Sequence, residues 1–418
     1  MACKDDDENS EHPPNVYIQE TAKGYELIRN GKPFFIKGGA GAGFLEQLKD
    51  AGGNTIRVYD TIGLKAILDQ AENLDLAVVV DIPLPTFEEN KKYWNGDLKK
   101  VKQRIKTTVS RYKDHPALLY WNLGNEIGYP EGYKNSQFFK KFNGIIEVVH
   151  SYDPNHPVST AIVAGSRKTI LSISFRSPEL DFISLNAFGS LSGLEPMLQS
   201  ISLLWDGPYV ISEWGLNGPW EAKKTSWGAP VEQTSTKKAE LLKGRYHSGA
   251  INNEACLGSF YFYWGIKQER TITWFSLFNQ DSSRSQVYHS LENLWTDKHN
   301  KYPGPEIEYA LLNGEGALKS NILIAGDTAK ADLILQQNVD SLNIHWEIRK
   351  EAWNNIFVQR PVIKNLIMNK YGNKATFQVP FEEGPYRLFV YIKDRYNNFA
   401  TTNIPFYVVR DEKNEIQP

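Results

Sequence analysis

The chain has 418 residues, more than one ordinary domain, and its formal net charge of −2 gives no reason to expect nucleic acid or another polyanionic partner. The sequence has no long stripe of Lys and Arg interleaved with aromatic residues, and no run approaches the roughly 18 to 20 apolar residues that span a bilayer. These features give no reason to expect a nucleic-acid-binding protein or a transmembrane helix.

The amino-terminal tail, residues 1–15, has almost nothing apolar to bury and carries a run of acidic residues, so we expect it to be disordered. It resembles the start of a mature bacterial lipoprotein whose signal peptide has been removed, with Met1-Ala2 as additions and Cys3 as the lipidated residue. The stretch CKDDDE also resembles the acidic export signal that places Bacteroidota lipoproteins on the outer face of the outer membrane. The alternative is an ordinary disordered terminus with a stray cysteine.

From residue 16 the chain alternates predicted strands and amphipathic helices. A short hairpin with turns at Lys23-Gly24 and Asn30-Gly31 leads into the first of eight apolar stretches. These strand candidates are PFFIKG (33–38), NTIRVYD (54–60), LAVVVDIPLP (76–85), LLYWNLGNE (118–126), PVSTAIV (157–163), DFISLNAF (181–188), PYVISEWG (208–215) and LGSFYFYW (257–264).

Helical segments lie between these strands and have apolar residues at intervals of three and four. They include GDLKKVKQRIKTTVSRYKDH (96–115), SQFFKKFNGIIEVVHSYD (136–153) and, after the eighth strand, SRSQVYHSLENLW (283–295). Eight such units in register predict an α/β fold, a closed (β/α)8 TIM barrel over residues 16–302, rather than an open doubly wound sheet.

Beyond Trp295 the pattern changes. The segment 300–321 is rich in Pro, Gly and Asn and predicts a linker and a first strand. Later segments alternate apolar and polar residues in period two: SLNIHWEIRKE (341–351), KATFQVPF (374–381), GPYRLFVYIKD (384–394) and NNFATTNIPFYVV (397–409). We therefore predict a C-terminal immunoglobulin-like β-sandwich over residues 303–418.

Two predicted barrel strands end on a glutamate, Glu126 on the fourth and Glu213 on the seventh. The carboxyl ends of barrel strands meet at the catalytic face, so we expect both side chains there. Glycoside hydrolysis needs such a pair, because one carboxyl donates a proton to the leaving oxygen while the other attacks the anomeric carbon or activates water. Either glutamate alone would fit a structural salt bridge. Together, in this order, they predict a glycosidase.

The motifs NLGNE and ISEWG resemble those of clan A glycoside hydrolases, and the likeness covers roughly Val16 to Thr296. In this clan the acid/base glutamate follows an asparagine at the end of strand four, and the nucleophilic glutamate ends strand seven. The resemblance implies that Glu126 is the acid/base, that Glu213 is the nucleophile, and that Asn125 hydrogen-bonds the sugar 2-hydroxyl.

Arg57, which closes the second strand, matches the clan's arginine that keeps the nucleophile ionised; a fixed cation lowers the pKa of a nearby carboxylate. Many clan members bond the nucleophile to a Tyr at the end of strand six, where this chain has Asn186 and Phe188. Either Tyr59 or another hydroxyl replaces that tyrosine, or Arg57 acts with less help.

The chain is rich in aromatic residues, with 11 Trp, 21 Tyr and 20 Phe. Core packing accounts for most of them, but sugars also stack their C–H faces on aromatic rings. Trp264, at the end of strand eight, matches the clan's aromatic floor, and Trp220 and Trp227 are candidate platforms for further sugars. The predicted substrate-binding residues are Arg57, Tyr59, Asn125, Asn186, Phe188, Trp214, Trp220, Trp227 and Trp264.

The segment IKGGAGAGF nearly matches a dinucleotide-binding fingerprint. Phe44, however, stands where a third glycine is needed for close helix–strand packing, so we interpret the glycines as a small first barrel loop. The sequence has no His pair at i, i+4 beside a Glu and no CxxC, and we expect neither a metal nor another cofactor.

A barrel followed by a sandwich resembles glycoside hydrolase family 158, the endo-β-1,3-glucanases of Bacteroidota; families 2 and 17 are relatives. This resemblance implies a retaining enzyme that cuts laminarin-type β-1,3-glucan internally by double displacement. We also expect a monomer, and the tail around Cys3 predicts a lipoprotein at the cell surface. Two alternatives stay open. A glucanosyltransferase would share every catalytic residue, and a non-catalytic glycan-binding protein would have lost one carboxylate.

Overall fold

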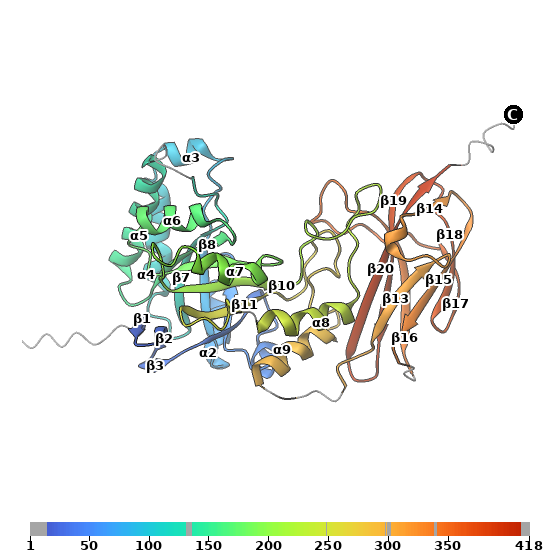
Figure 1. The fold of residues 1–418 in the computed structure, drawn as a ribbon, viewed down its shortest axis with the longest axis horizontal. Coiled ribbons are helices and arrows are strands. Elements are labelled where there is room, and N and C mark those ends of the chain that lie inside the picture. The colour runs from blue at the N-terminus through green and yellow to red at the C-terminus, as the bar shows by residue number, and fades with distance from the viewer. Residues whose placement is uncertain are drawn as a thin grey trace, which may run out of the picture.

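The computed structural model describes residues 15–130, 136–247, 249–296, 298, 302–337 and 341–410. Figure 1 shows a barrel and a β-sandwich side by side, with α8 (Ser235–Tyr246) and α9 (Gln286–Thr296) between their centres. Cys3 and most of the predicted tail lie outside the described residues, so the lipid anchor stays a prediction.

The barrel is closed by eight parallel strands in the order β10-β11-β4-β5-β6-β7-β8-β9, and the predicted TIM barrel is confirmed. Its strands are β4 (Ile36–Gly41), β5 (Thr55–Val58), β6 (Ala77–Ile82), β7 (Leu118–Asn125), β8 (Val158–Val163), β9 (Ile183–Asn186), β10 (Tyr209–Gly215) and β11 (Cys256–Trp264). Besides α8 and α9, its helices are α1 (Leu45–Asp50), α2 (Leu64–Asn73), α3 (Lys91–Asn95), α4 (Lys99–Tyr112), α5 (Ser136–Tyr152), α6 (Arg167–Arg176) and α7 (Leu191–Gln199).

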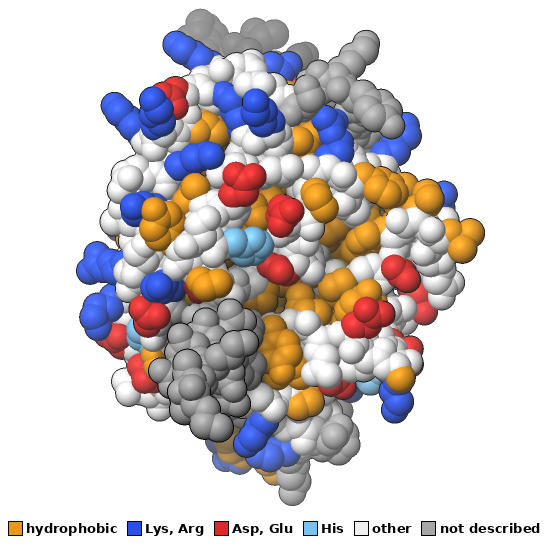
Figure 2. All heavy atoms as spheres, turned by 90° about the vertical axis from the view of Figure 1, so that its left-hand side faces the viewer, with side chains coloured by type: hydrophobic (Ala, Val, Ile, Leu, Met, Phe, Trp, Pro, Cys, Tyr) orange, Lys and Arg blue, Asp and Glu red, His pale blue; other side chains and the backbone are white. Residues whose placement is uncertain are grey.

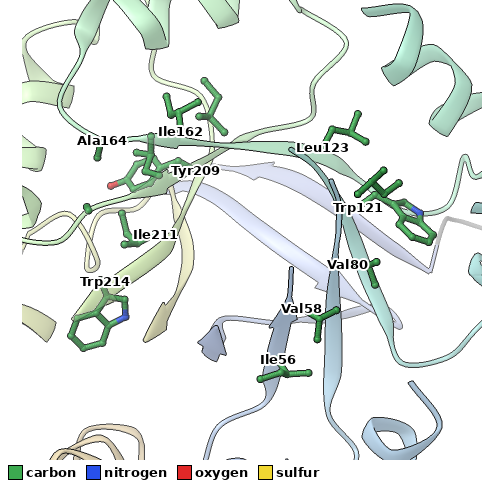
Figure 3. Packing of buried hydrophobic residues seen from close by; sticks show 14 of the residues in the cluster. Ile56, Val58, Val80, Trp121, Leu123, Ile162, Ala164, Tyr209, Ile211 and Trp214 are labelled. Atoms are coloured by element: carbon green, nitrogen blue, oxygen red, sulfur yellow. The ribbon is translucent and has the colours of Figure 1, made fainter. Parts of the chain in front are cut away.

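Outward-facing side chains of the strands pack against these helices and form a continuous apolar shell (Figure 3). Helix α4 joins this shell through the buried Ile105 and Val109, the spacing of one helix face. Complete burial of such a side chain contributes roughly 1.5 to 3 kcal/mol, so the shell is a main source of the barrel's stability.

The predicted hairpin is confirmed and covers the end of the barrel where its strands begin. It consists of β1 (Val16–Thr21), β2 (Gly24–Arg29) and the short β3 (Lys32–Pro33). Val16 and Leu27 pack in one cluster with Ile36 and Leu257, which lie at the starts of two barrel strands. The hairpin does not cover the other end of the barrel, where the strands end and the candidate active site lies.

The first barrel strand begins three residues later than predicted, at Ile36, and it contains three of the glycines that we had interpreted as a loop, Gly38, Gly39 and Gly41. A Cβ atom added at Gly38 would overlap the ring of Phe260, and one added at Gly39 would overlap Trp264. The glycines therefore allow β4 to lie against the large aromatic residues of β11. This packing explains the apparent dinucleotide fingerprint.

The C-terminal part forms the predicted β-sandwich of mainly antiparallel sheets. One sheet has the order β13-β15-β18-β17, from β13 (Ile307–Leu312), β15 (Thr328–Leu335), β18 (Lys374–Gln378) and β17 (Ile367–Tyr371). The other contains β16 (Asn343–Lys350), β19 (Gly384–Lys393), β20 (Asn398–Val409), β14 (Asn321–Ile324) and β12 (Arg284–Ser285). Strand β12 precedes α9 and pairs with β20, so the barrel part contributes to this sheet.

A buried polar network also joins the two parts. Arg387 in β19 donates to both carboxylate oxygens of Glu351 at 2.9 Å and to the carbonyl oxygen of Pro230, in the barrel part, at 2.8 Å. Glu232 of the barrel part accepts a hydrogen bond from Asn403 in β20 at 2.6 Å. Because these groups are buried, the contact between the two parts is specific in geometry.

We expect Arg387→Met to destabilise the protein by roughly 3 to 5 kcal/mol, because Glu351 would stay buried without its partner. Urea unfolding of the full chain measures this change. Lys374→Met is the matched control, since Lys374 pairs with Asp332 on the solvent-exposed side of the same sandwich. Equal free energies of unfolding for the two variants would contradict a stabilising role of the buried Arg387–Glu351 pair.

Figure 2 shows the barrel face at the left of Figure 1, where described Lys and Arg side chains are interspersed with Asp, Glu and hydrophobic ones. Among the described residues, no helix is long and apolar enough to cross a membrane.

Candidate active site

A cavity of about 570 Å³ lies at the carboxyl ends of the barrel strands and contains both Glu126 and Glu213. The structure brings them together with five of the predicted substrate-binding residues, which line the same cavity: Tyr59, Asn125, Asn186, Phe188 and Trp220. Arg57 lies beneath them, fully buried.

Glu213 points into this cavity because β10 contains a bulge. Ile211 pairs with Leu185 and Glu213 pairs with the next residue of β9, Asn186, so β10 has one extra residue at this place. A bulge reverses the alternation of side chains and can direct one of them to a new side. Glu213 therefore faces inward, whereas Trp214 joins the outer shell with Ile211 (Figure 3).

Glu126 directly follows β7 in a left-handed backbone conformation, with φ of 53°. Few residues other than glycine adopt this conformation, and such residues gather at functional sites. Its N–H donates to the carbonyl oxygen of Ala161 in β8 at 2.9 Å, and its Oε1 accepts from Asn186 Nδ2 at 2.7 Å. These two bonds fix the backbone and the side chain of Glu126.

Arg57 connects the residues at the bottom of the cavity. Its Nη1 donates to Glu213 Oε1 at 3.2 Å, and its Nη2 donates to Asn125 Oδ1 at 3.0 Å. Asp81 of β6 accepts from Nε at 3.1 Å and from Nη2 at 2.7 Å, which holds the guanidinium plane in place. Asp81 was not among the predicted site residues, although an acidic residue inside the apolar stretch AVVVDI is a signal for a buried partner.

Tyr59 donates from its hydroxyl to Glu213 Oε1 at 2.8 Å. Of the alternatives that the sequence left open, the structure supports a hydroxyl from Tyr59 in place of a strand-six tyrosine. Phe188 instead packs edge to face against Trp220, with ring centroids 5.5 Å apart.

Burial raises the pKa of Glu213 to about 7, although Arg57 and the Tyr59 hydrogen bond lower it; the nearby Glu126 raises it further. The expectation that Arg57 keeps the pKa of Glu213 low is therefore corrected, since desolvation outweighs the cation. Near neutral pH, Glu213 exists in both protonation states.

Trp264 does not line the cavity. It is fully buried and stacks on Trp295 of α9, with ring centroids 5.8 Å apart. On β4, Ala40 pairs with Phe262 and the next residue, Gly41, pairs with Trp264, so β11 carries an extra residue between the two aromatics. This irregularity turns Trp264 outward, and Phe262 lines the cavity in its place.

Trp227 lies beside the sandwich, with its ring 5.8 Å from that of Tyr407 in β20, and Trp214 lies in the outer shell. The predictions of sugar contacts for Trp214 and Trp264 are therefore corrected, because both side chains are fully buried. Trp227 does not line the cavity, and its contact with more distant sugars stays a prediction. Trp220 is 55% exposed and lines the cavity.

Several cavity residues lie in loops, where the sequence offered no periodic signal. They are Ser190, Glu221, Lys267, Glu269 and Phe357, and Val163 at the end of β8 lines the cavity as well. Among the described residues, no group of three or more His, Cys, Asp or Glu side chains is arranged to hold a metal ion.

Residues 57–217 match the family described as glycosyl hydrolases family 2, TIM barrel domain. A stretch of 101 residues is 30% identical to the probable mannan endo-1,4-beta-mannosidase F of Neosartorya fischeri and covers 23% of this chain and 22% of that protein. The chain thus matches a small part of that relative.

Two solved structures are similar in fold. A Bacteroides uniformis beta-glucuronidase 2 has 15% identity and a TM-score of 0.50, covering 95% of this chain and 48% of that chain. A GH2 beta-galacturonidase from Eisenbergiella tayi has 17% identity and a TM-score of 0.52, covering 69% of this chain and 55% of that chain. The chain thus spans about half of each structure (48% and 55%). Its barrel has the fold of clan A glycoside hydrolases, and residues 57–217 match the family 2 barrel domain. The assignment to family 158 stays an interpretation of the domain order.

Proposed function

We propose that this protein is a retaining β-glycoside hydrolase in which Glu213 is the nucleophile and Glu126 the acid/base. The observation that carries the proposal is the pair of hydrogen bonds from Arg57 and Tyr59 to one oxygen of Glu213, Oε1, in a cavity that also holds Glu126. These bonds orient the carboxylate and leave Oε2 available to attack. The family 2 barrel match supports the glycosidase class.

In the first step Glu126 donates its proton to the leaving sugar oxygen while Glu213 bonds to the anomeric carbon. In the second step Glu126, now ionised, takes a proton from a water molecule whose oxygen bonds to the anomeric carbon. The ester bond between the sugar and Glu213 breaks, and Glu213 is again a carboxylate. Asn125 Oδ1 accepts from Arg57 and from Asn186, each at 3.0 Å, so its Nδ2 is the group available to a sugar hydroxyl.

We further propose a neutral glycan as substrate. The carboxylates that line the cavity are Glu126, Glu213, Glu221 and Glu269, whereas Lys267 is the cation of the same lining. Lys267 already has a carboxylate neighbour, because its Nζ lies 3.6 Å from Glu269. A uronic acid would therefore meet an excess of like charge.

Among neutral glycans we propose β-1,3-glucan, cut internally, on the basis of the domain order. β-1,4-Mannan is the second candidate, because the sequence relative is a probable mannan endo-1,4-beta-mannosidase. A glucanosyltransferase is compatible with the same residues and differs in whether a sugar or water accepts the glycosyl group.

Incubation with laminarin, β-1,4- and mixed-linkage glucans, mannan, galactan and a polyuronide tests these proposals. Laminarin should give a ladder of oligosaccharides at early times, and products longer than the starting oligosaccharides would indicate the transferase. Cutting of mannan alone would favour the second candidate, and glucose as the sole early product would contradict internal cleavage. Activity on none of these glycans would contradict the enzyme proposal and favour the glycan-binding alternative.

We expect the acid limb of kcat/KM to fall near pH 7, because Glu213 must be ionised to attack and its pKa is about 7. Tyr59→Phe removes a hydrogen bond that lowers this pKa, so the limb should move upward. A hydrogen bond to a charged group contributes roughly 1.5 to 3 kcal/mol, equivalent to about one to two pH units.

The matched control for this pH shift is Tyr263→Phe, at a neighbouring tyrosine on β11, which should leave the limb in place. A limb that stays at the same pH in Tyr59→Phe would contradict the role of its hydroxyl.

A further inference from the structure

Phe357 lines the cavity although it belongs to the sandwich part of the chain, in the segment between β16 and β17. Its side chain is 62% exposed. An aromatic residue that served to hold two domains together would be buried between them, and this ring is not. Its position therefore needs another explanation.

The backbone next to Phe357 is fixed to the barrel. The carbonyl oxygen of Ile356 accepts hydrogen bonds from the N–H of Arg270 at 2.8 Å and from Gln268 Nε2 at 3.1 Å. Arg270 also donates to the carbonyl oxygen of Ala352 at 3.0 Å. The Phe357 N–H donates to Asn355 Oδ1 at 3.1 Å, which closes a local turn. An exposed ring is thus held on an ordered backbone.

The barrel loop that holds this segment also reaches the reacting groups. Lys267 Nζ lies 5.4 Å from the ring centroid of Phe262 and 5.9 Å from that of Phe357. Phe262 in turn packs edge to face against Tyr59, the donor to Glu213, with centroids 6.5 Å apart. Phe357 is therefore linked through Lys267 to Phe262, the ring that packs against Tyr59.

We propose that Phe357 forms a sugar-binding subsite next to the reacting sugar, so that the sandwich is a part of the substrate site. The ligand is a pyranose unit of a neutral glycan, whose apolar C–H face covers the ring and removes its exposed surface from water. This inference rests on the proposed glycosidase function. It predicts that Phe357 acts on chain-length preference, not on bond cleavage.

The test compares the full chain with Phe357→Ala on two substrates, laminarihexaose and β-glucosyl fluoride. The fluoride fills the reacting-sugar position alone and needs no second sugar to leave. Phe357→Ala should lower kcat/KM for laminarihexaose by roughly tenfold, the size expected for a partly buried aromatic ring, and leave that for the fluoride unchanged. If mannan is the polysaccharide cut, mannohexaose and β-mannosyl fluoride take their places.

Tyr371→Ala is the matched control, because Tyr371 is an aromatic residue of the same sandwich, 87% exposed and away from the cavity lining. Tyr371→Ala should leave kcat/KM unchanged for both substrates, and Phe357→Tyr should keep the wild-type ratio of the two kcat/KM values. An equal loss on both substrates, or no loss on either, would overturn the subsite. If the wild type hydrolyses neither substrate, the proposed function fails. Calorimetry then tests the subsite by itself: Phe357→Ala should bind laminarihexaose more weakly than the wild type, and equal binding would overturn the subsite.

Discussion

Glu213→Gln should abolish turnover of every glycoside that the wild-type protein cleaves. A carboxamide cannot form the glycosyl ester, and loss of a catalytic nucleophile typically lowers kcat by about 10⁴-fold or more. The fold should survive, because Arg57 keeps its bonds to Asp81 and the amide resembles the protonated form that Glu213 already populates near pH 7. Initial rates with an aryl glycoside and with laminarin, beside a thermal unfolding curve, measure both effects.

Glu269→Gln is the matched control for this loss, since Glu269 lines the same cavity and its near neighbour is Lys267 at 3.6 Å. It should keep most of the activity. If Glu269→Gln eliminates turnover while Glu213→Gln retains it, the nucleophile has been assigned to the wrong carboxylate.

The strand pattern of the barrel could be predicted because buried parallel strands are nearly continuous apolar runs, and residues at their ends have known positions. Glu126 and Glu213 were found in this way. Which neighbour faces the cavity could not be predicted, because the bulges in β10 and β11 are visible only in the pairing of strands. The same cause directed Trp214 and Trp264 outward.

Contacts between distant segments were equally hidden. Asp81 and Arg57 are 24 positions apart and meet only when their two strands pair. Phe357 belongs to the second domain, between β16 and β17, and its place beside the barrel depends on how that domain docks. Alternation in period two could predict β16, β19 and β20. By contrast, β14 and β17 are short: the exposed positions of β14 are isoleucines, Ile322 and Ile324, and four exposed residues in a row end β17.

Glu126→Gln should separate the two steps of the reaction. Natural glucans have a sugar leaving group that needs a proton, so their hydrolysis should fall strongly, by roughly 10² to 10⁴-fold, the usual contribution of general acid catalysis. An aryl glycoside releases a phenolate without that proton, and its glycosyl-enzyme should still form on Glu213 if the cavity accepts the aryl group. Release of the sugar then limits turnover, since the amide cannot activate water. A burst of phenolate followed by a slow steady state is the expected trace.

Added azide should restore turnover of the aryl glycoside in Glu126→Gln, because this small anion attacks the glycosyl-enzyme without needing a base. The product should be the β-glycosyl azide, since two inversions give net retention. Glu126 is exposed to the cavity and hydrogen-bonded to Asn186, so its replacement by an uncharged amide removes the negative charge that would repel the anion on that side. An α-glycosyl azide formed by the Glu213 variant would instead exchange the two assignments. If neither variant loses activity, the two glutamates are structural and the catalytic proposal is wrong.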